Sequence, residues 1–224
     1  MRKCAAVGFA ISFVFLVSLF CAAQAGKVES VGPLTDNAVP QAVRQALDTK
    51  GYRVTLDASA PFCEIYIRKS IPAQTKKEVE GVVYPQLAES TMIGVIHFPG
   101  VAADFRGHRI PAGFYTLRYE IMPDDGNHLG AAPNRDFLPV IPAAADTDPT
   151  ATFKFQDLVG MSAQTSGTKH PSPLSLVEAV SVPSTPTLTK NDQGYWIFSS
   201  STKLNSPDSC GSPLTIAVSA SRIA

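Results

Sequence analysis

The segment from Met122 to Asp136 holds the densest set of side chains that could do chemistry. Its polar members are Asp124, Asp125, Asn127, His128, Asn134, Arg135 and Asp136. Carboxylates and an imidazole can bind a divalent cation, and a guanidinium can pair with a carboxylate. These residue types suggest a binding site for a small ligand, a glycan or a metal ion, with Asp125, His128, Arg135 and Asp136 as its candidate residues.

The same segment also fits an ordinary connection between strands. Hairpin loops are usually shorter, and much longer ones often carry function. However, Asp, Asn and Gly are also the residues that exposed turns use. The stretch "DDGNH" lacks the alternating acidic or amide side chains that precede the glycine of a calcium loop. A binding site and a solvated structural loop therefore both stay open.

Histidines offer an alternative, enzymatic function. His128 could converge with His97 or His108 to bind a metal ion, which predicts a small metal-dependent hydrolase. A divalent metal is the one cofactor this would require. His97 has apolar strand neighbours, a setting more typical of a core or edge histidine.

Serine motifs do not assign a catalytic residue. Ser200 and Lys203 fit the pattern Ser-x-x-Lys, but that chemistry needs a helix start, and Ser200 follows a predicted strand. The stretch from Gly160 to Gln164 begins like a nucleophile elbow but lacks its final glycine. These observations favour a binding protein over an enzyme.

The first 25 residues predict a signal peptide. Arg2 and Lys3 precede a long apolar run, and Ala23-Gln24-Ala25 fits the cleavage rule. An uncleaved anchor is the alternative, whereas lipidation of Cys21 would need a small residue in place of Phe20. We expect a secreted or periplasmic protein with a single domain over residues 26–224.

Charge and hydropathy limit the classes of partner that this chain is expected to bind. The chain has 19 basic and 19 acidic residues, and two basic ones leave with the signal. It has no basic block, which argues against nucleic acid, and after residue 25 no apolar run is long enough to span a membrane. The expected partner is an unknown ligand or envelope component.

Cysteine usage predicts a disulfide. Cys63 and Cys210 remain after cleavage, and an even pair in an exported chain is typical of a bridge. It would close a loop of about 150 residues and stabilise the fold by about 4 kcal/mol. Two separate buried thiols are the alternative.

Hydrophobic periodicity predicts a mainly β fold, an antiparallel β-sandwich with one or two short helices. Helical spacing indicates helices within 36–51 and 144–167, ended by Gly51 and Gly167. Alternation predicts the strands that make up the rest. Their ranges are 52–57, 60–70, 91–100, 114–121, 137–142, 194–204 and 212–221.

Alternation also predicts which side chains face the core. On the strand after Gly113, it turns Tyr115, Leu117 and Tyr119 inward and Arg118 outward. Further along the chain, Trp196 and Phe198 share one face, for which core is favoured over a sugar-binding platform. Pro139 cannot donate to a ladder, which predicts an edge strand.

The stretch "DFRGHRIPAGFYTLRYEI" resembles a pattern in exported bacterial β-sandwich proteins, including an uncharacterised envelope family and carboxypeptidase-regulatory-like modules. A Pro-Ala-Gly turn precedes Tyr-x-Leu on a strand. The resemblance covers Asp104 to Ile121 only. It implies a β-sandwich with a non-catalytic role, and it transfers no catalytic residue.

Overall fold

The computed structural model describes residues 26–56, 60–75, 78–104, 106–125, 134–179, 183–206 and 209–220, and side chains in these ranges as far as Asn205. The predicted signal peptide and His128 lie outside these residues. Two helices, α1 (Gln41–Ala46) and α2 (Phe155–Ser166), and a short 3-10 turn, η1 (Ala143–Ala145), accompany the strands. The strands are β1 (Lys27–Val31), β2 (Gly51–Thr55), β3 (Cys63–Ile67), β4 (Ile71–Pro72), β5 (Met92–Phe98), β6 (Ala102–Ala103), β7 (Arg109–Ile110), β8 (Gly113–Arg118), β9 (Glu120–Ile121), β10 (Asp136–Pro142), β11 (Pro173–Val177), β12 (Thr187–Lys190), β13 (Trp196–Ser206) and β14 (Ser209–Ala220).

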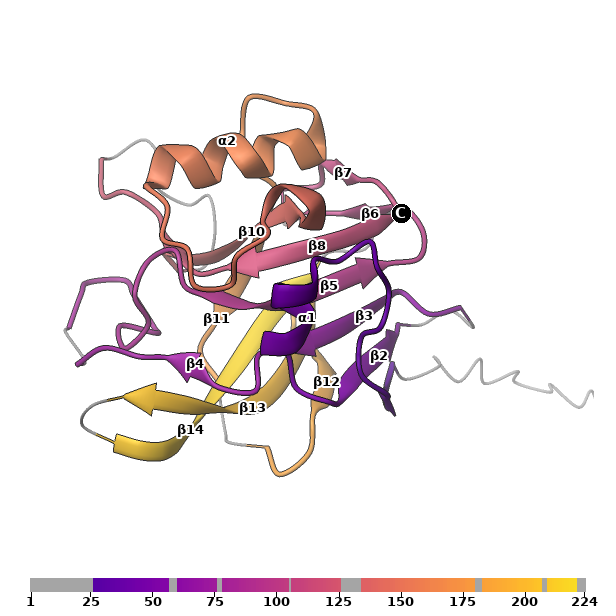
Figure 1. Ribbon diagram of the computed structural model, residues 1–224, viewed down its shortest axis with the longest axis horizontal. Helices are drawn as coiled ribbons and strands as arrows, with labels where there is room; N and C mark the ends of the chain where they lie inside the picture. The colour runs from indigo at the N-terminus through magenta and orange to yellow at the C-terminus, as the bar shows by residue number, and fades with distance from the viewer. Residues whose placement is uncertain are drawn as a thin grey trace, which may run out of the picture.

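The strands form two facing layers, and the predicted antiparallel β-sandwich class is confirmed. The pairing order is β1-β2-β3-β5-β8-β10-β11-β14-β13-β12 (Figure 1). The layer that begins with β1 and the layer that ends with β12 meet at β10. Every pairing along this order is antiparallel, while the short β4 pairs with β13 in parallel.

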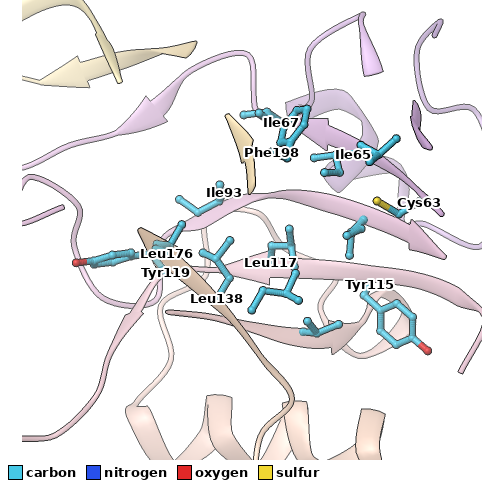
Figure 2. Packing of buried hydrophobic residues seen from close by; sticks show 14 of the residues in the cluster. Cys63, Ile65, Ile67, Ile93, Tyr115, Leu117, Tyr119, Leu138, Leu176 and Phe198 are labelled. Carbon is cyan, nitrogen blue, oxygen red and sulfur yellow. The ribbon is translucent and has the colours of Figure 1, made fainter. Parts of the chain in front are cut away.

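Side chains from both layers fill the space between them. Figure 2 shows Phe198 from β13 beside Ile65 and Ile67 from β3. Leu117 from β8 belongs to the same cluster, and all four side chains are buried. Each such side chain contributes roughly 1.5–3 kcal/mol when it is removed from water. Tyr115, Leu117, Trp196 and Phe198 are buried as predicted.

The helix α1 covers the outer face of the first layer, over β3 and β5 (Figure 1). Val39, Val43 and Leu47 pack there against Tyr66 and other buried residues of the layer. The helix is shorter than predicted because Leu47 turns to extended backbone and forms a β-bridge with Arg68. Gly51 does not end the helix. It begins β2, where a Cβ would lie 2.3 Å from the ring of Tyr66.

The helix α2 lies over β10 (Figure 1), and hydrogen bonds fix it there. Ser162 Oγ and Thr165 Oγ1 both donate to the carbonyl oxygen of Val140, at 2.9 and 2.8 Å. Gly167 ends the helix in the left-handed region (φ 66°), as predicted. The helix begins at Phe155, later than the predicted segment, because residues 143–145 form the 3-10 turn η1 instead.

The strand β10 is not at an edge, so the inference from Pro139 is wrong. Val140 to Pro142 pair with β8, and Phe137 to Pro139 pair with β11. Pro139 lies opposite Pro173. The missing donor is tolerated in a central strand because Val140 N donates to the carbonyl oxygen of Ser172, which makes Pro139 and Pro173 a pair that exchanges no hydrogen bonds. On its other side, Pro139 falls between the residues that pair with β9 and those that pair with β8.

The predicted disulfide is not seen. Cys63 is a free thiol, buried among the apolar side chains between the layers. The backbone of Cys210 lies opposite Asn205, near the turn end of the β13–β14 hairpin, whereas Cys63 lies beside Phe198. From Phe198 to Asn205 the strand advances on the order of 20 Å. Cysteine Cα atoms must lie within about 7 Å to be bridged.

Among the described residues, no helix has the length and apolar character needed to cross a membrane.

Candidate functional site

The predicted site residue Asp136 is a structural carboxylate in the described part of the loop. Its side chain is 0% exposed. It accepts hydrogen bonds from the backbone N–H groups of Val83 (2.8 Å) and Tyr84 (2.9 Å) and from the hydroxyl of Tyr119 (2.8 Å). Its oxygens are therefore directed into the protein, where they hold the 78–90 segment against β10.

Arg135 also makes structural contacts. Its Nε donates to the carbonyl oxygen of Met122 at 2.9 Å, and its Nη1 donates to that of Glu80 at 3.1 Å. The two ends of the loop are further joined by the backbone bond from Met122 N to Arg135 O. Asp125 is exposed at the last described position before the gap, and His128 lies within it. The structure thus does not bring Arg135 and Asp136 together as a ligand site.

The histidines of the hydrolase hypothesis have separate local partners. His97 stacks on Phe114, with ring centroids 4.1 Å apart, and its Nδ1 is 3.6 Å from the carboxylate of Glu64. His108 Nδ1 is 3.1 Å from the buried carboxylate of Asp104. Within the described ranges, no group of three or more His, Cys, Asp or Glu side chains could hold a metal ion. The convergence with His128 stays a prediction.

A groove of about 520 Å³ lies elsewhere, between the two layers and beside the middle of β13. We call it the lysine groove. Three segments that are far apart in the sequence line it: the α1–β2 turn, the end of β3 with the turn that follows it, and the middle of β13. Its lining residues are Asp48, Lys50, Tyr52, Ile67, Arg68, Lys69, Ser200, Ser201, Thr202 and Lys203.

The topology brings these segments together. The chain leaves β3, forms the short β4 and pairs with β13 at Leu204 and Asn205. Thr202 Oγ1 donates to the carbonyl oxygen of Arg68 at 3.0 Å and so joins β13 to the end of β3. On the other side, Tyr52 of β2 packs its ring 5.9 Å from that of Phe198. The lining is therefore fixed on both sides by the sandwich itself.

The electrostatics of the lysine groove are strongly positive. Lys50, Lys69 and Lys203 are exposed side chains, and none of their ammonium groups forms an ion pair with a described carboxylate. The amine of Lys69 donates to the carbonyl oxygen of Gln45 at 3.2 Å. A positive, uncompensated surface attracts anions and raises their local concentration.

The two other charged residues of the groove have partners of their own. An oxygen of Asp48 accepts the backbone N–H of Lys50 at 3.0 Å. Arg68 Nη1 donates to the carbonyl oxygens of Pro149 (3.1 Å) and Met92 (3.5 Å), and burial is the main cause that lowers the pKa of Arg68. Because Asp48 and Arg68 carry opposite unit charges, the three lysines determine the net charge of the groove.

Hydroxyl groups form the deeper part of the lysine groove. Ser200 is 1% exposed and lines the groove together with Tyr52. Burial and the nearby Asp48 carboxylate raise the pKa of Tyr52, and the neighbouring Ser200 hydroxyl has a smaller opposing effect. The phenol is therefore neutral at ordinary pH. The groove combines positive charge at its rim with neutral hydroxyls below.

Sequence reasoning missed this groove. It noticed Ser200 and Lys203 only as a Ser-x-x-Lys motif, and the strand β13 confirms that they do not start a helix. Lys50 and Lys69 were ordinary surface lysines in the sequence. The strand order brings the three lysines together, and the local sequence patterns used for prediction do not determine that order.

A second open groove, of about 630 Å³, has the opposite charge. Glu78, Glu80 and Glu178 line it together with Val79, Val82, Val83 and Pro85. Three carboxylates, with no cation among the described lining residues, repel an anion. The lysine groove is thus the better candidate for an anionic ligand.

No protein-family model, no curated protein and no solved structure matches this chain.

Proposed function

We propose that this protein is an exported, non-enzymatic β-sandwich protein that binds an anionic small ligand or glycan of the cell envelope in the lysine groove. The observation that carries the proposal is the convergence of Lys50, Lys69 and Lys203 on one groove without a carboxylate partner among the described residues. Like charges held close together repel, so their free energy falls when an anion lies between them.

The size of the groove supports a small ligand. Sites for small molecules commonly enclose about 300–1,000 Å³. The groove volume of about 520 Å³ lies in this range. Exposed lysines each contribute at most about 1 kcal/mol to an ion pair and are screened by salt. We therefore expect modest affinity that falls as ionic strength rises.

Inorganic pyrophosphate is a suitable first probe because it is small, multiply charged and carries no hydroxyl chain. Calorimetric titration at low salt should show saturable binding to the mature protein. The double variant Lys50→Ala, Lys203→Ala should weaken it at least tenfold. The matched control is Lys154→Ala, Lys169→Ala, which removes two exposed lysines outside the groove and should leave the affinity unchanged.

Two results would overturn the proposal. The first is an absence of saturable binding for every anion tested at low salt. The second is equal weakening in the groove variant and the control, which would assign binding to general surface charge. Unfolding midpoints of both variants should match that of the parent chain, because all four lysines are exposed.

Export itself depends on residues 1–25, whose sequence predicts a cleaved signal. N-terminal analysis of the protein recovered from the periplasm or medium should begin at Gly26. An intact N-terminus on a membrane-associated protein would instead favour the uncleaved anchor.

A further inference from the structure

The strand β13 has a gap in its pairing beside the lysine groove. On one side, it pairs with β14 without interruption from Trp196 to Lys203. On the other side, β12 pairs with β13 only as far as Ser199, and β4 begins to pair at Leu204. Among the described strands, residues 200–203 therefore have a partner on one side only. They span about 13 Å of extended backbone.

The lysine groove lies along this gap. The residues of β13 that line it are Ser200, Ser201, Thr202 and Lys203. Successive side chains of a strand point to opposite faces of the sheet. A groove lined by four consecutive residues therefore borders the edge of the strand and not one face alone. The edge of a strand carries the backbone groups with which a further strand would pair, so the groove provides space where the sheet lacks a strand.

The fold keeps both ends of the gap in place. At one end, Leu188 of β12 packs against the core, and the turn after β12 is closed by a bond from Asn191 N to Tyr195 O at 3.0 Å. At the other end, Ala73 N donates to Asn205 O at 3.0 Å and holds β4 beside β13. Neither strand can slide along β13 without breaking these contacts, so the gap is a lasting feature of the described sheet.

We infer that the lysine groove binds a short acidic peptide in extended conformation, which adds to β13 as a strand between β12 and β4. The inference rests on the proposed anion-binding function and names its ligand class. When a peptide adds to an open strand edge, main-chain hydrogen bonds give affinity and side chains give specificity. Here Lys50, Lys69 and Lys203 favour aspartate and glutamate, since none of them has a carboxylate partner among the described residues.

An acidic peptide combines two properties that simpler ligands have one at a time. A bare anion can use the exposed lysines but has no backbone to pair with β13. A neutral peptide can pair with β13 but leaves the lysines without an anion. The acidic peptide uses both, so it should bind more tightly than either.

The test is a calorimetric titration of the mature protein at low salt with the peptide acetyl-Asp-Val-Asp-Val-amide. Its comparison probes are the same peptide with every residue N–H methylated, the neutral acetyl-Asn-Val-Asn-Val-amide, and succinate, which carries two carboxylates without a peptide backbone. The acidic peptide should bind at least tenfold more tightly than each of the three. If succinate or the methylated peptide binds as tightly, or if only pyrophosphate binds, the inference is overturned and the proposed function stands. Binding of no anion would overturn both.

Amide hydrogen exchange locates the bound peptide. Saturation with the acidic peptide should slow exchange within residues 200–203, whereas saturation with pyrophosphate should not. Residues 196–199 already pair on both sides and serve as the internal control. Tight binding without added protection in residues 200–203 would overturn the inference, because it would place the peptide outside the gap.

Lysine variants test the charge preference. The double variant Lys50→Ala, Lys203→Ala should reduce the preference for the acidic over the neutral peptide at least threefold. The control Lys154→Ala, Lys169→Ala, outside the groove, should leave this preference unchanged. An equal preference in both double variants would overturn the inference.

Discussion

Arg118 and Asp146 form a bidentate ion pair in which both side chains are 0% exposed. Arg118 Nε and Nη2 each donate to the Asp146 carboxylate at 2.7 Å. The remaining guanidinium donors reach the carbonyl oxygens of Ser90, Ala151 and Asp148. All the donors of this buried cation therefore have acceptors, which anchors the 146–153 segment to β8.

We expect Asp146→Ala to destabilise the protein by about 3–5 kcal/mol, because it leaves a buried guanidinium without its counter-charge. Urea unfolding monitored by circular dichroism measures the change. Asp157→Ala, at an exposed position of α2, should stay within about 0.5 kcal/mol of the parent. A loss below about 1 kcal/mol for Asp146→Ala would show that the pair adds little to stability.

The role of Asp136 can be separated from ligand binding. Asp136→Ala leaves three donors without their acceptor, the N–H groups of Val83 and Tyr84 and the Tyr119 hydroxyl. We expect stability to fall by about 3 kcal/mol or more, with less loss for Asp136→Asn, which retains an oxygen acceptor. At a temperature where Asp136→Asn is folded, its affinity for pyrophosphate should equal that of the parent. Weaker pyrophosphate binding by a folded Asp136→Asn variant would show that Asp136 takes part in ligand binding, as the sequence suggested.

Glu120 should make stability depend on pH. Its side chain is 1% exposed, and burial raises its pKa to about 8, with a further contribution from Glu89 and an opposing hydrogen bond from Ile121 N. In the unfolded chain the pKa is about 4.3. The folded state holds the proton more tightly, so the stabilising effect is complete below pH of about 4.3 and is lost as pH rises through about 8.

The urea midpoint of the parent should accordingly fall between pH 5 and pH 9, and Glu120→Gln should reduce this fall. Glu178→Gln changes an exposed carboxyl instead and should follow the parent. A parent whose midpoint is constant or rises over the range, or a Glu120→Gln variant with the same slope as the parent, would contradict the assignment.

The Cys63 thiol should be inert in the folded protein. It is buried, and burial raises its pKa far above the ordinary value, so almost none of it is thiolate at neutral pH. Native protein treated with iodoacetamide should carry no label on the Cys63 peptide, and protein unfolded in urea without reductant should be fully labelled there. Protection in urea that is lost only after reduction would instead reveal the predicted disulfide.

Alternation predicted the inner face well because one physical rule decides it. Tyr115, Leu117 and Tyr119 point into the space between the layers, and Trp196 and Phe198 meet them from the other side as buried residues. Gly167 ends α2 since a left-handed residue is needed there. These features depend on neighbours within a few residues, which the sequence displays directly.

Features set by distant pairing could not be predicted in this way. Arg118 was assigned outward, and it does lie opposite Leu117 and Tyr119 in the alternation, yet it is completely buried. The 146–153 segment covers the outward-facing side chain of Arg118 and forms hydrogen bonds with it. No pattern in the local sequence predicts this contact. The lysine groove is a second case. Its three lysines are far apart in the sequence, and the pairing of β4 with β13 places the segments that carry them side by side.

The strand β10 belongs to both layers, and this affects how the protein unfolds. One end of the strand pairs with β8 and the other with β11, and α2 is hydrogen bonded to the carbonyl oxygen of Val140 between them. Separating either layer would remove the backbone partners of β10 on that side and expose the shared core to water. Unfolding one layer alone therefore costs nearly as much free energy as unfolding both, so we expect the sandwich to unfold in one cooperative step.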